Sequence, residues 1–240
     1  MRVSHRPITK EAFEQKPMRV VNALRKDIQG IPVWVEFVLI ITICFGHLIY
    51  HSSQTLFIDA SKVTNIITDQ SALADGMFDI VVVCITLGFL KLRGWKLTEF
   101  LPVKATWTGL FLAVAMLAGH RFLAIVSYTL LSGIFGIQMV AGVQSTLSPI
   151  GVIATSIDVG FIEELIVLGY VTHVLQHRGP FFAITISTCI RLSYHLYQGP
   201  LVMIIVIPMG VLFGIIYWRY RNLWPFMLAH AFYDLMILAP

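Results

Sequence analysis

Residues 150–175 read IGVIATSIDVGFIEELIVLGYVTHVL and form an apolar segment long enough to cross a bilayer. Two adjacent acids, Glu163 and Glu164, lie near its middle. A charged side chain at the centre of a bilayer costs roughly 2.5–3.5 kcal/mol on insertion scales, and acids in such places usually serve a function. This stretch therefore predicts a membrane-spanning helix that presents a pair of functional acids.

The composition of the whole chain also indicates a membrane protein. Of its 240 residues, 57% are hydrophobic and only 12% are charged, which is more apolar surface than one soluble core could bury. The net charge is +4, but the basic residues form short clusters between apolar runs, so we expect a lipid bilayer and no nucleic acid as partner. The three cysteines show no CxxC spacing, which argues against a disulfide framework and a cysteine zinc site.

Seven apolar segments of sufficient length follow a basic N-terminal region. They cover approximately residues 33–50, 77–92, 107–132, 148–175, 181–198, 200–218 and 222–238. Basic connections alternate with acidic or uncharged ones, as the positive-inside rule requires of seven helices with a cytoplasmic N-terminus. We therefore expect an all-α fold, a polytopic membrane helix bundle of about seven transmembrane helices. In this prediction residues 1–32 are a basic cytoplasmic segment and residues 33–240 are a single transmembrane domain.

The last four predicted spans carry three pairs of polar residues. The adjacent Glu163 and Glu164 point about 100° apart on a helix, so one can face a cavity while the other packs against a neighbour. The other two pairs are spaced by four residues and each share a helix face. They are Arg191 with His195, and His230 with Asp234. The pattern predicts one polar cluster inside the bundle, in a core of about residues 148–238.

Polar residues of the earlier spans have simpler interpretations. Glu36 lies near a helix end, where its side chain can reach the interface at little cost. His120 and Arg121 fall near the middle of the third predicted span. Arg121 is most simply a counter-charge for an acid elsewhere in the bundle, and a role facing the substrate is the alternative.

Acids and histidines together indicate hydrolysis with water as the nucleophile. A glutamate in a dry site can take a proton from water, and histidines can share that proton or donate to a developing oxyanion. The sequence has neither the GxSxG of many serine hydrolases nor the HExxH of many zinc proteases. Zinc held by the glutamates and histidines stays an alternative, since both are acceptable ligands. We predict no metal and no cofactor.

The last third of the chain resembles the CAAX prenyl endopeptidase and bacteriocin-processing family, the glutamic intramembrane proteases also called the Abi family. Its EExxxR motif is matched by Glu163 and Glu164, with Leu168 where the arginine should be. Its second motif, an aromatic residue followed four positions later by histidine, is matched by His195 but has Arg191 in the aromatic position. The third motif, histidine followed four residues later by asparagine or aspartate, is matched by His230 and Asp234.

The resemblance implies a role for each matched residue. Glu163 would be the general base that activates water, assisted by His195, and Glu164 would orient the site. His230 and Asp234 would stabilise the oxyanion of the tetrahedral intermediate. The chain would then be an intramembrane endopeptidase that cleaves a membrane-associated peptide or lipidated protein tail. Its compact length is similar to that of bacterial members, so we expect an integral, multi-pass protein of the bacterial cell membrane.

Leu168 departs from the family pattern, and Arg191 offers a replacement. In antiparallel fourth and fifth spans, Leu168 and Arg191 each lie about one turn toward the cytoplasm from the polar residues of their own helix. We therefore expect them at one depth, with Arg191 delivering the guanidinium from the fifth span. Two alternatives stay open: a catalytically silent member of this fold that acts as a bacteriocin immunity or scaffold protein, and a proton-coupled carrier, since buried acids and histidines also build proton relays.

Overall fold

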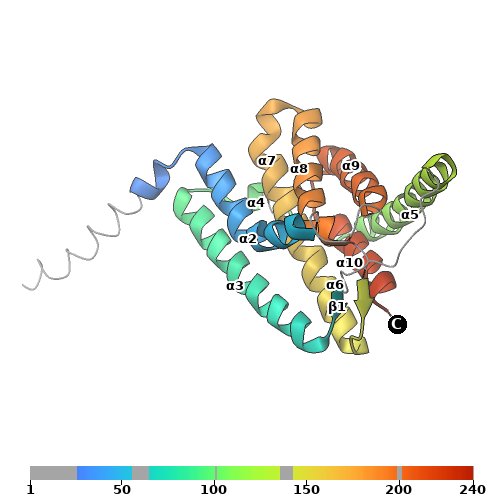
Figure 1. Ribbon diagram of the computed structural model, residues 1–240. Coiled ribbons are helices and arrows are strands. Elements are labelled where there is room, and N and C mark those ends of the chain that lie inside the picture. The colour runs from blue at the N-terminus through green and yellow to red at the C-terminus, as the bar shows by residue number, and fades with distance from the viewer. Residues whose placement is uncertain (1–25, 56–64, 101, 136–142, 199–201, 240) are drawn as a thin grey trace, which may run out of the picture.

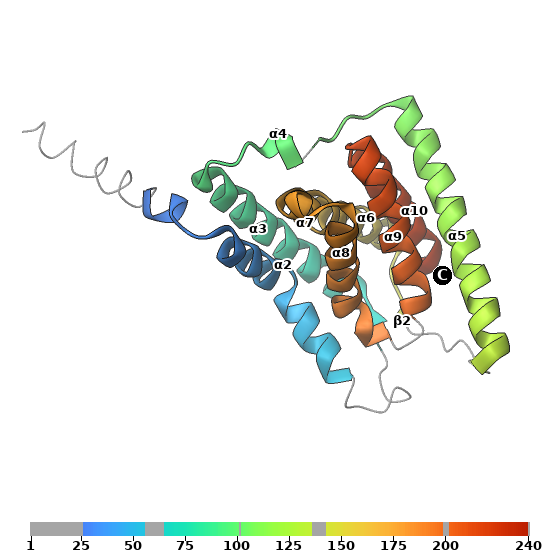
Figure 2. The ribbon, with the colours of Figure 1, turned by 90° about the horizontal axis from the view of Figure 1, so that it is seen from above.

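The computed structural model describes residues 26–55, 65–100, 102–135, 143–198 and 202–239, and almost all of them are helical. Figure 1 shows a bundle of long helices, and Figure 2 shows the segment from α6 to α7 near its middle with α2, α3, α8, α9 and α10 around it. The long helices are α2 (Val33–Thr55), α3 (Asp69–Arg93), α5 (Trp107–Phe135), α8 (Pro180–His195), α9 (Val202–Tyr220) and α10 (Trp224–Leu238), and α5 lies at the edge of the bundle beside α9 and α10. The predicted all-α fold class is confirmed.

Two very short strands are the exception among the described residues. β1 (Asn65–Ile67) and β2 (Val143–Ser145) pair in parallel, with Ile66 opposite Gln144. Each strand precedes a helix, so the pair joins the start of α3 to the start of α6 (Pro149–Glu163). Three-residue strands in connecting segments carry no periodicity that the sequence could have revealed.

Four helices among the described residues are long and apolar enough to cross a membrane. They are Val33–Gln54, Asp69–Leu92, Trp107–Ile134 and Met203–Tyr220, and Trp224–Leu238 is a shorter apolar helix. All seven predicted apolar segments contain helix, but the number of about seven spans and the cytoplasmic N-terminus stay predictions. Most of the predicted basic segment, residues 1–25, lies outside the described residues.

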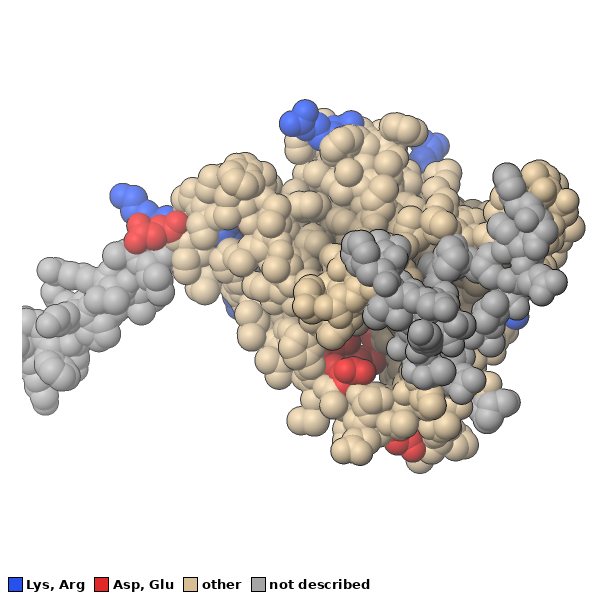
Figure 3. All heavy atoms as spheres, viewed as in Figure 1, with Lys and Arg blue, Asp and Glu red and all other residues tan. Residues whose placement is uncertain are grey.

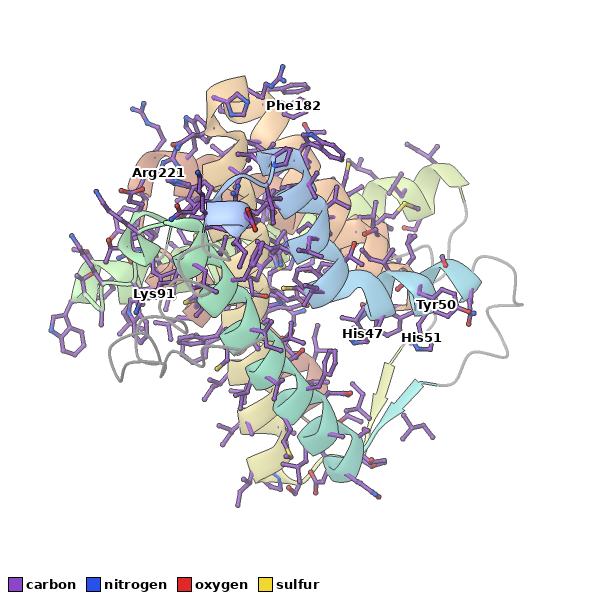
Figure 4. The ribbon with its side chains drawn as sticks, turned by 90° about the vertical axis from the view of Figure 1, so that its left-hand side faces the viewer. His47, Tyr50, His51, Lys91, Phe182 and Arg221 are labelled. Carbon is purple, nitrogen blue, oxygen red and sulfur yellow. The ribbon has the colours of Figure 1, made fainter. Side chains whose placement is uncertain are left out.

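Charged side chains are unevenly distributed over the bundle. In Figure 3 the Lys and Arg side chains visible on the bundle gather mainly toward its upper end, and acidic side chains lie lower, some of them in a hollow. Figure 4 places Lys91 and Arg221 on the same side of the molecule, at the end of α3 and between α9 and α10. Such a separation is what a bundle with basic cytoplasmic connections would show.

Local signals explain where the helices begin and end. α3 begins at Asp69, well before the predicted residue 77, because Thr68 and Ser71 form a reciprocal capping box at its N-terminus. α3 ends at Arg93 and is capped by Gly94, whose φ of 92° lies in the left-handed region that glycine adopts most readily. Ser148 caps α6 by accepting a hydrogen bond from the backbone N–H of Gly151. Short elements complete the connections: α4 (Leu97–Phe100) and η4 (Leu196–Gln198).

The central helix is interrupted where the two glutamates lie. α6 ends at Glu163, a π-helix η2 covers Glu164–Tyr170, and α7 (Val171–Leu175) and the 3-10 helix η3 (Gln176–Arg178) follow. The helix predicted over residues 148–175 is therefore present from Pro149 onward, but it changes from α to π geometry in its middle. Every residue from Glu163 to Thr172 is buried, so this interrupted segment is the core of the bundle. π-helical turns are rare and occur frequently at functional sites.

A buried ion pair corrects the interpretation of Glu36. Its side chain does not reach the interface: it is fully buried and accepts hydrogen bonds from Arg93 Nε at 2.5 Å, Trp95 Nε1 at 3.0 Å and Tyr170 Oη at 2.9 Å. Arg93 also donates to the carbonyl of Gln29 at 2.6 Å. Glu36 therefore joins α2, the end of α3 and the end of the π-helix, because a buried carboxylate needs several donors.

The polar pair of α5 also has structural partners. His120 is buried, and its Nε2 lies 3.1 Å from the carbonyl oxygen of Ile205 in α9, in the turn that precedes Pro208. A proline inside a helix disturbs the backbone hydrogen bonds of that turn, so His120 supplies a partner there. Arg121 is exposed, lies 5.7 Å from the ring centroid of Tyr233, and forms no ion pair with any described acid, so the expected counter-charge role was wrong.

Candidate active site

The six residues predicted for the site lie together in the structure. Glu163 and Glu164 come from the junction of α6 and η2, Arg191 and His195 from α8, and His230 and Asp234 from α10. Close helix contacts bring these elements together, because α6 meets α10 through Gly160 and Ala231. Glu163 follows Gly160 by three residues and His230 directly precedes Ala231, so this contact fixes the distance between acid and histidine.

Arg191 contacts both glutamates. Its Nη1 lies 3.2 Å from Oε2 of Glu163, and its Nη2 lies 2.9 Å from a carboxylate oxygen of Glu164. All three side chains are buried, with exposed fractions of 1% for Arg191, 9% for Glu163 and 0% for Glu164. Arg191 therefore supplies the expected guanidinium, which is shared between two carboxylates.

The register of α8 against the central helix differs from the expected one. Ser187 Oγ donates a hydrogen bond to the carbonyl of Val167 at 2.7 Å, which places these two residues side by side. In antiparallel helices Arg191, four residues after Ser187, is then level with Glu163, four residues before Val167. Leu168 therefore lies about one turn away from Arg191, and the prediction that they share a depth was wrong. Arg191 lies at the depth of Glu163, so its side chain reaches both acids directly.

His195 lies beside Glu163. Its Nε2 is 3.6 Å from Oε2 of Glu163, slightly beyond the range of a direct hydrogen bond. Its Nδ1 is buried and has no hydrogen-bond partner among the described residues. The side chain keeps an exposed fraction of 16%, so Nε2 belongs to the more open side of the cluster.

His230 connects the two glutamates to Asp234. Its Nδ1 lies 2.7 Å from Oε1 of Glu164, a hydrogen bond that fixes the plane of the ring. Its Nε2 then lies 3.9 Å from Oε2 of Glu163 and 3.7 Å from Oδ2 of Asp234. His230 is therefore surrounded by three carboxylates, and its Nε2 is the nitrogen that faces the interior of the site.

Tyr194 is a member of the site that sequence reasoning missed. Its hydroxyl donates a hydrogen bond to Oε2 of Glu163 at 2.6 Å, and its side chain is buried. The motif spacings draw attention to Arg191 and His195 on either side of it, not to Tyr194. A tyrosine in an apolar segment nevertheless needs a partner for its hydroxyl when it is buried, and this requirement was a usable signal.

Other histidines do not contribute. His47 and His51 lie on the exposed surface of α2, where Figure 4 shows them near Tyr50.

Among the described parts of the chain, no group of three or more His, Cys, Asp or Glu side chains is arranged so that it could hold a metal ion. The structure thus supplies acids, imidazoles and a guanidinium in one buried cluster, a set suited to proton transfer and charge stabilisation.

The comparison with known families matches this same region. Residues 145–236 match the family model described as type II CAAX prenyl endopeptidase Rce1-like. This match supports the resemblance of the region to the CAAX prenyl endopeptidase and bacteriocin-processing family. No curated protein and no solved structure matches the chain significantly.

The family match indicates the broad class of the protein. It supports a CAAX-protease type of function, a hydrolase that acts on a membrane-associated protein substrate. Together with the long apolar helices it indicates an integral membrane protein. The matched residues include the whole polar cluster from Glu163 to Asp234, whereas α2, α3 and α5 precede the match.

Proposed function

We propose that the protein is an intramembrane endopeptidase in which Glu163 activates water to hydrolyse a peptide bond. The observation that carries the proposal is the unequal surroundings of the two Glu163 oxygens. Oε2 accepts hydrogen bonds from Tyr194 and Arg191, whereas no described residue donates to Oε1. Oε1 is therefore the oxygen that can take a proton from water.

In the proposed first step, a water molecule contacts Oε1 of Glu163 and Nε2 of His195. Glu163 takes one proton from it while the water oxygen forms a bond to the carbonyl carbon of the substrate. The carbonyl oxygen becomes an oxyanion in the same step. His195 assists Glu163: its Nε2 lies on the open side of the cluster, where it can accept a hydrogen bond from the water and orient it.

The oxyanion needs a donor inside the dry site. Nε2 of His230 faces the interior, and Glu164 accepts from Nδ1 on the other side of the ring. When both nitrogens carry protons, His230 can donate to the oxyanion without losing its bond to Glu164. Asp234 lies beside the same nitrogen and would help His230 to stabilise the oxyanion. Preorganised donors of this kind usually contribute the largest single part of the rate enhancement.

In the second step the intermediate collapses. Glu163, now protonated, gives its proton to the amide nitrogen, the carbon–nitrogen bond breaks, and an amine and a carboxyl group leave. Arg191 and Glu164 hold the charge of the cluster nearly constant through both steps. No atom other than those of water and the peptide is consumed.

The proposed substrate is a membrane-associated peptide or a lipidated protein tail. The helices expose large apolar side chains such as Phe122, Ile125 and Ile153, which fit a lipid environment. A substrate with apolar or prenylated parts would be held in the same environment. We propose the bacterial cell membrane as its location.

Glu163→Gln tests the mechanism. It removes the proton acceptor with almost no change in volume, so we expect cleavage of a membrane peptide to be abolished while the protein stays folded in detergent. The unfolding temperature should fall only by the weaker bonds from Tyr194 and Arg191 to the neutral amide. A screen of the purified protein against a membrane peptide library provides the substrate. Activity that persists in Glu163→Gln would refute the mechanism, and equal loss of fold and activity would give Glu163 a structural role.

One observation favours a second candidate, a catalytically silent immunity or scaffold protein. Leu168 stands where the family motif has an arginine. The contacts of Arg191 with both glutamates argue for the enzyme, because they provide the missing positive charge. Wild-type protein that cleaves no member of the library, yet is stably folded, would favour the silent candidate.

A further inference from the structure

Tyr194 makes the shortest contact to Glu163. The 2.6 Å hydrogen bond from its hydroxyl is shorter than the 3.2 Å contact of Arg191 with the same oxygen. Its side chain is almost completely buried, so the hydroxyl faces Glu163 and not the open side of the cluster. The hydroxyl of Tyr194 can therefore affect a reaction through Glu163, while its ring lies beside His195, with centroids 4.7 Å apart.

Two residues of α2 hold Tyr194 in place. The ring of Phe45 stacks on the ring of Tyr194, with centroids 4.6 Å apart and an interplanar angle of 8°. Ser52 Oγ donates a hydrogen bond to the backbone carbonyl of Tyr194 at 2.8 Å. Phe45 and Ser52 are seven residues apart and so share one face of α2. Helix α2 precedes the region that matches the family, so this support comes from outside the matched residues.

These contacts fix the orientation of one carboxylate. Oε2 of Glu163 is held by Tyr194 from one direction and by Arg191 from another. A partial rotation of the carboxylate would break both bonds inside a buried site, where unpaired polar groups are costly, whereas a full half-turn only exchanges two equivalent oxygens. Oε1 is thereby kept as the free oxygen.

We propose that Tyr194 is a positioning residue: its hydroxyl, braced by Phe45, holds the Glu163 carboxylate so that Oε1 faces water and substrate. The proposal rests on the proposed role of Glu163 as the general base. It assigns to α2 a part in catalysis, because the ring of Phe45 and the hydroxyl of Ser52 set the position of Tyr194.

Tyr194→Phe is the decisive variant, since it removes the hydroxyl and keeps the stacked ring. We measure cleavage of an internally quenched farnesylated peptide, ending in cysteine, two aliphatic residues and a variable residue, by the full chain in detergent. We expect kcat to fall about ten- to hundredfold, because the base loses a charge-assisted hydrogen bond and its orientation. KM should change by less than about twofold, since the substrate contacts stay the same. A merely structural defect would not separate kcat from KM in this way.

Tyr217→Phe is the matched control. Tyr217 is equally buried, lies in α9, and packs its ring against Phe226, and its hydroxyl has no hydrogen bond to a described acid. The same loss of one buried hydroxyl there should leave kcat unchanged. Phe45→Leu provides a second variant: loss of the stacked ring should lower kcat in the same direction as Tyr194→Phe, by a smaller factor.

A second measurement is independent of turnover. In a double-mutant cycle of thermal unfolding, Tyr194→Phe should lower the unfolding temperature more in the wild type than in Glu163→Gln, because only an ionised carboxylate forms the strong hydrogen bond. Additive temperature shifts, or a kcat of Tyr194→Phe equal to that of the wild type, would overturn the proposal. Coupled shifts in a wild-type protein that cleaves no peptide would leave the contact standing and would refute the endopeptidase function instead.

Discussion

Gly160 of α6 lies directly against Ala231 of α10, so that a Cβ atom on Gly160 would be only 2.8 Å from the backbone nitrogen of Ala231. This contact joins the helix that carries the glutamates to the helix that carries His230. Glycine is required at this position because of the close approach of two backbones, since its own φ is not in the left-handed region. The distance between Glu163 and His230 therefore depends on one missing methyl group.

Gly160→Ala should separate the two helices and impair the site. We expect a loss of about 1–3 kcal/mol in the free energy of unfolding, as for other overpacked contacts. Activity should fall further than the stability loss explains, because His230 moves away from Glu163. Thermal unfolding in detergent and initial cleavage rates measure the two effects.

Gly88→Ala is the control for this prediction. Gly88 lies in α3, and a Cβ atom there would meet nothing within 4 Å. Alanine is the better helix former by about 1 kcal/mol, so this variant should be as stable as the wild type or slightly more stable. If both variants behaved alike, the close contact of α6 with α10 would not be the reason for the effect.

Hydropathy was sufficient for the existence of the helices but not for their limits. The apolar runs identify every long helix, because a bilayer-length apolar segment has few other stable conformations. The start of α3 depends instead on Thr68 and Ser71, a local hydrogen-bond pattern outside the apolar run. The π-helix Glu164–Tyr170 is as apolar as the α-helical residues on either side of it, apart from Glu164, so composition does not distinguish it.

The site was predictable where spacing carries the information. Residues four apart share a helix face, which is why the pairs Arg191 with His195 and His230 with Asp234 could be proposed from the sequence. Contacts between residues on different helices could not be predicted in this way, because one sequence does not specify which helices are neighbours. The buried position of Glu36 beside Arg93 belongs to this class.

Asp234→Asn tests how the oxyanion is stabilised. An ionised carboxylate only accepts hydrogen bonds, so Asp234 can donate to an oxyanion only when it is protonated. If donation is its role, Asp234→Asn should keep most of the activity, whereas Asp234→Ala should lose about a hundredfold in kcat, the usual effect of removing one such donor. The wild type should also lose activity as the pH rises and Asp234 loses its proton, and Asp234→Asn should lack this loss.

The pH profiles of kcat for the three proteins decide the matter. An Asp234→Asn variant as inactive as Asp234→Ala would show that a carboxylate is needed at this position as an acceptor. Asp234 would then serve to hold the protonated ring of His230, whose Nε2 is 3.7 Å from Oδ2 of Asp234.

Chelation tests whether a metal takes part. Glutamate and histidine are acceptable zinc ligands, so the chemistry of the residues alone leaves this possibility open. With Glu163 as the base, activity should be unchanged after treatment with EDTA or phenanthroline, and metal analysis of the active protein should find no stoichiometric zinc. Activity that is lost on chelation and restored by one equivalent of zinc would replace the glutamate mechanism.

The exchange of Leu168 and Arg191 tests the source of the positive charge. Arg191→Phe should leave two buried carboxylates without their guanidinium, at a cost of roughly 3–5 kcal/mol in stability, and should be inactive. Side chains on a helix point toward its N-terminus, so an arginine introduced at position 168 would extend back toward Glu164, about one turn away. The double variant Leu168→Arg with Arg191→Phe restores the usual family arrangement and should recover much of the stability and activity that the single variant loses.

A double-mutant cycle on unfolding and cleavage measures this recovery. Leu168→Arg alone is the necessary comparison, because Leu168 is buried and a larger, charged side chain beside an existing guanidinium should be destabilising. Rescue therefore means that the double variant loses less stability and activity than the sum of the losses of the two single variants. The difference is the favourable coupling between positions 168 and 191. Simple additivity would mean that a guanidinium from the central helix cannot serve the acids from about one turn away. The contact of Ser187 with Val167 places Arg191 at the same depth as Glu163. This alignment would then be essential to the site.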